Sequence, residues 1–109
     1  MKELGCAITI CDRDGIILYM NDLSKKTFAK SGGEQLIGTK LCDCHPEPAR
    51  TKLMEMLASG KGNSYTIEKN GIKKMIYQTP WFKDGEYSGF MELSLPIPYQ
   101  MPHFIRPAF

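Results

Sequence analysis

Turn signals at three points along the chain restrict its fold more than any other feature. Each signal is rich in glycine, aspartate or asparagine, which favour tight turns between strands. The turns are Asp12-Arg13-Asp14-Gly15, Asn70-Gly71 and Lys83-Asp84-Gly85. They separate runs with β-strand character: Gly5–Asp12 from Ile16–Met20, Asn63–Lys69 from Ile72–Phe82, and the latter from Glu86–Leu95. The sequence therefore predicts a hairpin at the start of the chain and three antiparallel strands at its end.

Between these two groups of strands, the sequence has helical character. Asn21 is a good N-cap for a helix over Asp22–Lys30, and Glu34–Ile37 is expected to form one helical turn. Pro46-Glu47-Pro48 opens a longer helix, because proline is tolerated in a first turn. Its predicted apolar stripe is Leu53, Met54, Leu57 and Ala58, and Gly60 ends it. The chain is therefore expected to be an α+β domain with helices inserted between strands 2 and 3.

The composition limits the class of function. The 109 residues fit one domain, and the net charge of +2 with scattered lysines argues against nucleic-acid binding. No apolar run approaches the roughly 20 residues of a membrane span, and no signal peptide is visible. We expect a cytoplasmic protein that does not enter membranes, with its four cysteines reduced.

Four short motifs, in this order and spacing, resemble the PAS family. Ile10–Asn21 resembles its entry hairpin, Leu36–Leu41 its Ile-Gly signature, His45–Arg50 the start of its central helix, and Tyr87–Met91 the opening of its last strand. The resemblance covers about residues 4–95. It implies a five-stranded antiparallel sheet with the helices packed on one face. It also implies a sensory or interaction module that binds a small ligand or a protein partner.

The end of the chain departs from the family pattern. Leu93-Ser94-Leu95 runs into Pro96-Ile97-Pro98, which blocks the connecting helix found in relatives that carry a kinase or cyclase. We therefore expect a domain over residues 1–95 and a Pro/aromatic tail over 96–109. Since the chain contains no output domain, signalling is expected to act on an effector protein in trans. The exposed aromatics of the tail, with Trp81 as a candidate to join them, are expected to dock on its own sheet or on a second subunit, in a homodimer.

The resemblance places a ligand pocket between the inner face of the sheet and the central helix. The amide of Gln78 aligns with Ile76 by strand alternation, and a buried amide needs a partner. The predicted lining residues are Leu41, Cys44, His45, Met54, Leu57, Ile76, Gln78, Met91 and Leu93.

Cys42-Asp43-Cys44-His45 is the densest group of chemically reactive residues, and it leaves several interpretations open. Cys6 or Cys11 would have to complete a metal site. Haem-binding relatives have an axial histidine where this chain has Leu53, so His45 or Cys44 would have to replace it. Thiols beside a helix N-terminus also suit redox sensing. The simplest alternative is that these side chains only pack. The cofactor is therefore left unknown, and no metal site is assigned.

No catalytic constellation stands out, since the chain has two histidines and no phosphate-binding loop. The sequence thus predicts a non-enzymatic sensory domain that binds a small ligand or a partner. The alternatives are a homodimerisation module with a filled core, or a metal, haem or redox sensor.

Overall fold

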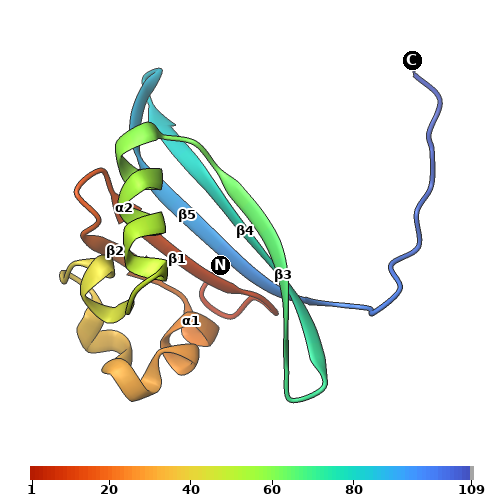
Figure 1. Ribbon diagram of the computed structural model, residues 1–109, viewed down its shortest axis with the longest axis horizontal. Coiled ribbons are helices and arrows are strands. Elements are labelled where there is room, and N and C mark those ends of the chain that lie inside the picture. The colour runs from red at the N-terminus through yellow and green to blue at the C-terminus, as the bar shows by residue number, and fades with distance from the viewer. Residues whose placement is uncertain (109) are drawn as a thin grey trace.

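The computed structural model describes residues 1–108, apart from the side chain of Cys44. Its five strands form one antiparallel sheet in the order β2-β1-β5-β4-β3 (Figure 1). The strands are β1 (Ala7–Asp12), β2 (Ile17–Met20), β3 (Asn63–Lys69), β4 (Ile72–Lys83) and β5 (Glu86–Ile97). The predicted fold class, with helices inserted between strands 2 and 3, is confirmed. Strand β5 extends two residues past the predicted domain end at residue 95.

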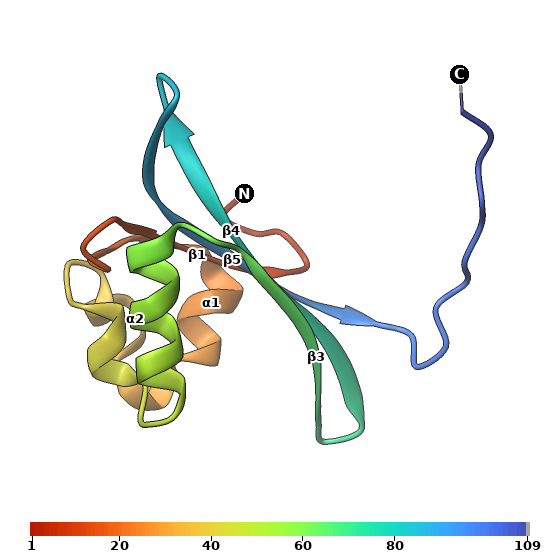
Figure 2. The same cartoon turned by 45° about the horizontal axis from the view of Figure 1, so that its top comes forward.

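The helical segment between β2 and β3 lies on one face of the sheet (Figures 1 and 2). It contains α1 (Asp22–Thr27), α2 (Ala49–Ser59) and three 3₁₀ turns, η1 (Ala29–Ser31), η2 (Gly33–Leu36) and η3 (Leu41–Cys44). The first helix is shorter than predicted, because the chain tightens after Phe28 into η1, where Ser31 N–H donates to the Phe28 carbonyl. Within residues 1–108, neither helix has the length and apolar character needed to cross a bilayer.

The hydrophobic core lies between the helical segment and the inner face of the sheet. Sheet, helix and 3₁₀ turn all contribute to it. Its buried members are Cys11, Ile17, Met20, Leu41, Leu53, Met56 and Phe90. Burying a large apolar side chain contributes about 1.5–3 kcal/mol, so these contacts hold α2 and η3 against the sheet. The Tyr87 hydroxyl also donates to the Leu57 carbonyl at 2.8 Å, which ties β5 to α2.

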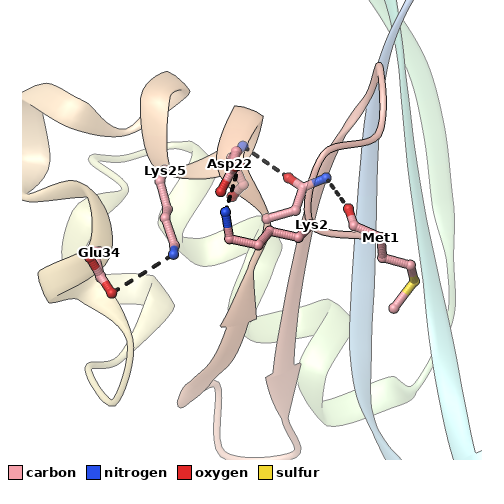
Figure 3. A network of polar contacts seen from close by, with 7 residues as sticks. Met1, Lys2, Asp22, Lys25 and Glu34 are labelled. Atoms are coloured by element: carbon pink, nitrogen blue, oxygen red, sulfur yellow. Dashed lines mark hydrogen bonds and ion pairs between the residues drawn. The ribbon is translucent and has the colours of Figure 1, made fainter.

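The first residues of the chain are tied to α1 (Figure 3). The Asp22 N–H donates to the Lys2 carbonyl at 2.9 Å, and Lys2 Nζ lies 3.1 Å from the Asp22 carboxylate. A second ion pair joins Lys25 of α1 to Glu34 of η2 at 3.8 Å. Because these charges lie at the surface, they contribute little to stability.

The tail leaves the sheet as an extended segment (Figure 2). Lys73 Nζ donates to the Tyr99 carbonyl at 3.3 Å. Farther along, the apolar side chains are mostly in solvent, with Phe104 71% and Ile105 90% exposed. The described part of the tail does not fold back over its own sheet, and Phe109 lies outside the described residues. Trp81, the candidate to join the tail, instead donates to the Cys11 carbonyl at 2.9 Å.

Candidate functional site

A row of polar residues crosses the inner face of the sheet. The pairing of β1 with β5 places Cys11 opposite Phe90, and both belong to the core under the helices. Two residues along, Thr9 lies opposite Glu92, and therefore on the same inner face. The register continues the row through Gln78 of β4 to Asn63 of β3. Polar side chains from four strands thus meet in an otherwise apolar layer.

Glu92 is the central member of this row and its only charged one. Burial raises the pKa of its carboxyl above the usual 4.5. His45 and a hydrogen bond from the Gln78 side chain act in the opposite direction, because both favour the carboxylate. Asn63 Nδ2 in turn approaches Gln78 Oε1 at 3.5 Å. Asn63, Gln78 and Glu92 therefore form a connected polar network that ends on a buried carboxyl group.

Two cavities open beside Glu92, and both are also lined by Tyr65. One has a volume of about 220 Å³, runs along β3, β4 and β5, and reaches Phe28. The other, of about 170 Å³, lies below α2 and is bordered by His45 and Gln78. A much smaller void of about 20 Å³ is lined by Glu92 on one side and by core residues on the other. The space between sheet and helices is thus only partly filled.

The structure brings several of the predicted pocket residues to this inner face. Leu41 and Ile76 are buried, while His45 and Gln78 line the cavity below α2. Leu57 is half-buried against the core. The side chain of Cys44 lies outside the described part of the chain.

Three predicted pocket residues point elsewhere. Met54 is 53% exposed, because the turn of α2 directs Leu53 and Met56 to the core instead. Met91 and Leu93 alternate along β5 with Phe90 and Glu92, so their side chains extend from the outer face.

Glu92 is the functional candidate that the predicted lining set lacked. The strand around it has a detectable signal, since a glutamate between Met91 and Leu93 interrupts an apolar run. A charged residue there marks either a solvent face or a functional buried position. Only the register with Cys11 and Phe90 decides between the two.

The cysteine and histidine group is arranged mainly by packing. His45 Nδ1 lies 2.9 Å from the Leu41 carbonyl oxygen, and its ring lies 6.3 Å from that of Phe28. Cys42 packs against the core, and burial raises the pKa of the Cys11 thiol. Among the described side chains, no three of His, Cys, Asp or Glu gather closely enough to hold a metal ion. Leu53, at the position of the axial histidine in haem-binding relatives, is buried in the core.

Solved structures with the same architecture come from sensory proteins. The Aer2 receptor from Vibrio cholerae, a dual PAS–haem oxygen sensor, matches with a TM-score of 0.60 and 19% identity over 85% of this chain and 95% of that chain. The PAS domain of the histidine kinase ThkA matches with a TM-score of 0.65 and 16% identity over 84% and 98%. The chain has a PAS-like fold.

A third structure with the PAS-like fold is the VqmA dimer from Vibrio cholerae, with a TM-score of 0.64 and 15% identity. That match covers 99% of this chain but 55% of VqmA, so this chain spans about half its length. No family model matches the sequence, and no curated protein matches it either. At identities this low, the likeness concerns the fold.

The buried carboxyl of Glu92 predicts a pH-dependent stability. Its pKa is higher in the folded chain than the usual 4.5 of an unfolded one. The contribution of Glu92 to the free energy of unfolding is therefore greatest below pH 4.5. It falls as the pH rises through the folded pKa. Glu92→Gln removes the ionisation and keeps an amide that pairs with Gln78. The variant is expected to become progressively more stable than the wild type as the pH rises.

Urea unfolding at about pH 4 and about pH 8 measures this difference. The matched control is Glu68→Gln on the same sheet, since Glu68 is exposed. Its two unfolding curves should follow those of the wild type. An equal effect of Glu92→Gln at both pH values would contradict the assignment.

Proposed function

We propose that this chain is a sensory PAS-like domain that binds a small molecule between its sheet and α2 and acts on an effector protein in trans. The observation that carries the proposal is the polar row centred on Glu92, which faces two unfilled cavities. Ligand sites are typically apolar cavities with a few convergent polar groups. The fold that this chain shares with sensory proteins supports the same assignment.

The geometry offers a route from the ligand to the surface. Gln78 and Glu92 lie on β4 and β5, while His45 lies between η3 and α2. A molecule in the cavity below α2 would contact both layers at once. It would therefore bias the position of α2 against the sheet, and only such a differential contact can shift a conformational equilibrium.

Native mass spectrometry of the gently purified protein, together with its absorption spectrum, tests this proposal. We expect a small molecule that is retained in the native state and released on denaturation. Gln78→Leu, which removes the hydrogen bond to Glu92, should reduce its occupancy at least tenfold. Thr66→Val, on the exposed side of β3, is the control and should retain it.

Other results would replace the proposal. A Soret band or a bound metal ion would favour the cysteine- and histidine-based alternatives. A protein that retains nothing, and that no small molecule stabilises, would indicate a pure interaction module.

We further propose that the domain forms a homodimer. Two apolar surfaces are exposed, the tail around Phe104 and Ile105 and the outer face of the sheet around Tyr77. The neighbouring fold of VqmA is that of a dimer. Sedimentation analysis should give a dimer for the wild type and a shift toward monomer for the Phe104→Ser/Ile105→Ser double variant. A wild-type monomer at high micromolar concentration would rule out this assembly.

A further inference from the structure

The larger cavity on the inner face has opposite charges at its two ends. Glu92 lies at the inner end, next to Gln78 and near the ring of Tyr65. Lys74 and Lys69 line the other end, close to the β3–β4 turn. Between them the lining is largely apolar and includes Phe28 and Ile76. A molecule that fills this space meets a carboxyl group at one end and ammonium groups at the other.

Lys74 lines the cavity and forms no ion pair within residues 1–108. It is half-buried, and the sheet register places it on the inner face opposite Ile67. The ion pairs in this described part of the chain are Lys2–Asp22, Lys25–Glu34 and Arg50–Asp43. The group that most favours the ionised form of Glu92 through its charge is His45, not Lys74. Lys74 thus has no anionic partner among the described residues and is available for an anionic group of a ligand.

The sheet geometry sets the spacing of the two ends. Lys74 and Gln78 lie four residues apart on β4, and Gln78 pairs with Glu92. Four strand residues span about 13 Å, and the long side chains shorten the gap by reaching toward each other. The volume of about 220 Å³ lies below the roughly 300–1,000 Å³ of drug-sized sites. An elongated small metabolite fits this description better than a compact one.

We propose that this cavity binds a small amphoteric molecule, an aminocarboxylate whose ammonium group pairs with Glu92 and whose carboxylate pairs with Lys74. This inference rests on the proposed function, since it names the ligand class for the larger of the two cavities beside Glu92. The ammonium group donates hydrogen bonds to the buried carboxylate, and charged hydrogen bonds of this kind are the strong ones. The methylene chain lies against Phe28, Tyr65 and Ile76. An ω-amino acid has its two charges far enough apart to reach both ends, whereas an α-amino acid does not.

Calorimetric titration with four probes tests the inference: 6-aminohexanoate, hexylamine, hexanoate and glycine. The wild type is expected to bind 6-aminohexanoate at least tenfold more tightly than any of the other three. Glu92→Gln should lose the advantage over hexanoate, and Lys74→Met should lose the advantage over hexylamine. Lys73→Met is the matched control, because its side chain alternates to the outer face, and it should keep the wild-type order. Circular dichroism confirms that each variant is folded.

Four results would overturn the inference. Hexanoate or hexylamine binding as tightly as 6-aminohexanoate would show that one end plays no part. If Lys74→Met still prefers 6-aminohexanoate to hexylamine, Lys74 does not bind the carboxylate of the ligand. A neutral or apolar molecule retained by the native protein, with none of the four probes bound, would leave the proposed function standing and reject this ligand class. If no probe binds and nothing is retained, both proposals fall together.

Discussion

Replacing Gly89 with alanine is expected to prevent the domain from folding. A Cβ atom at this position would lie 2.0 Å from the Cys11 carbonyl oxygen and 2.7 Å from Trp81 Nε1. The backbone φ of +155° is also one that side chains rarely adopt. Because the closest atom belongs to the main chain of the neighbouring strand, it cannot move aside without separating β1 from β5. We expect a loss of about 4 kcal/mol or more, a large part of the roughly 5–15 kcal/mol that stabilises a typical domain.

Gly85→Ala is the matched control for this substitution. Gly85 also has a positive φ, +81°, but the space that its Cβ would occupy has no other atom within 4 Å. Only the left-handed backbone is strained, which costs about 1–2 kcal/mol. Circular dichroism and urea unfolding should show a folded Gly85→Ala variant and an unfolded Gly89→Ala variant. If both variants unfold at similar urea concentrations, the close approach of β1 to Gly89 does not constrain the fold.

The turns were predictable because their chemistry is local. Asn70 and Gly71 both have positive φ, 53° and 77°, as a type I′ hairpin requires. Asp84 and Gly85 repeat this pattern at 51° and 81°. Each turn fixes its two flanking strands as neighbours, and three such turns leave few ways to arrange five strands. The order of elements therefore followed from residues that act over short stretches of chain.

The faces of β5 and α2 were harder to assign, because apolar residues occur on both sides of each element. Met91 and Leu93 are more apolar than their neighbours Glu92 and Ser94, so alternation alone favours the wrong phase for the inner face. The aromatic ring of Phe90 decides the phase, since it packs on Cys11 beneath the helices. In α2, Met54 and Met56 are equally apolar candidates for the core, but only Met56 is buried there. These choices depend on contacts between distant segments and are absent from local patterns.

The position of Glu92 and Gln78 on the inner face leaves several apolar side chains of β4 and β5 on the outer face. If Glu92 and Gln78 occupy the inner face, then Met91, Leu93 and Tyr77 occupy the outer one. Around Glu92, this arrangement reverses the usual order for a sheet covered on one side, in which apolar residues face the covering layer. A ligand that pairs with the inner polar row and a second subunit that covers the outer face would each account for one half of this reversal. The two proposals are therefore complementary.

Replacing Asn21 with alanine is expected to destabilise the domain by about 3 kcal/mol or more. Its side chain is fully buried at the junction of β2 and α1. Its Oδ1 accepts hydrogen bonds from Ile8 N–H at 2.9 Å and Ser24 N–H at 3.1 Å. Its Nδ2 donates to the carbonyls of Cys6 at 2.8 Å and Met1 at 3.2 Å. Alanine leaves these main-chain groups unpaired, and each buried unpaired group costs about 1–3 kcal/mol.

Asn63→Ala makes the same chemical change where much less depends on it. Asn63 is half-buried near a sheet edge and has one long contact, 3.5 Å, to Gln78. Urea unfolding should therefore show a change below about 1 kcal/mol for Asn63→Ala, as for most sites without a special role. A comparable loss in the two variants would contradict the role of Asn21. If the two losses differ as predicted, the single side chain of Asn21 joins the N-terminal segment, β1 and α1. The entry hairpin then depends on this side chain for its position against the helices.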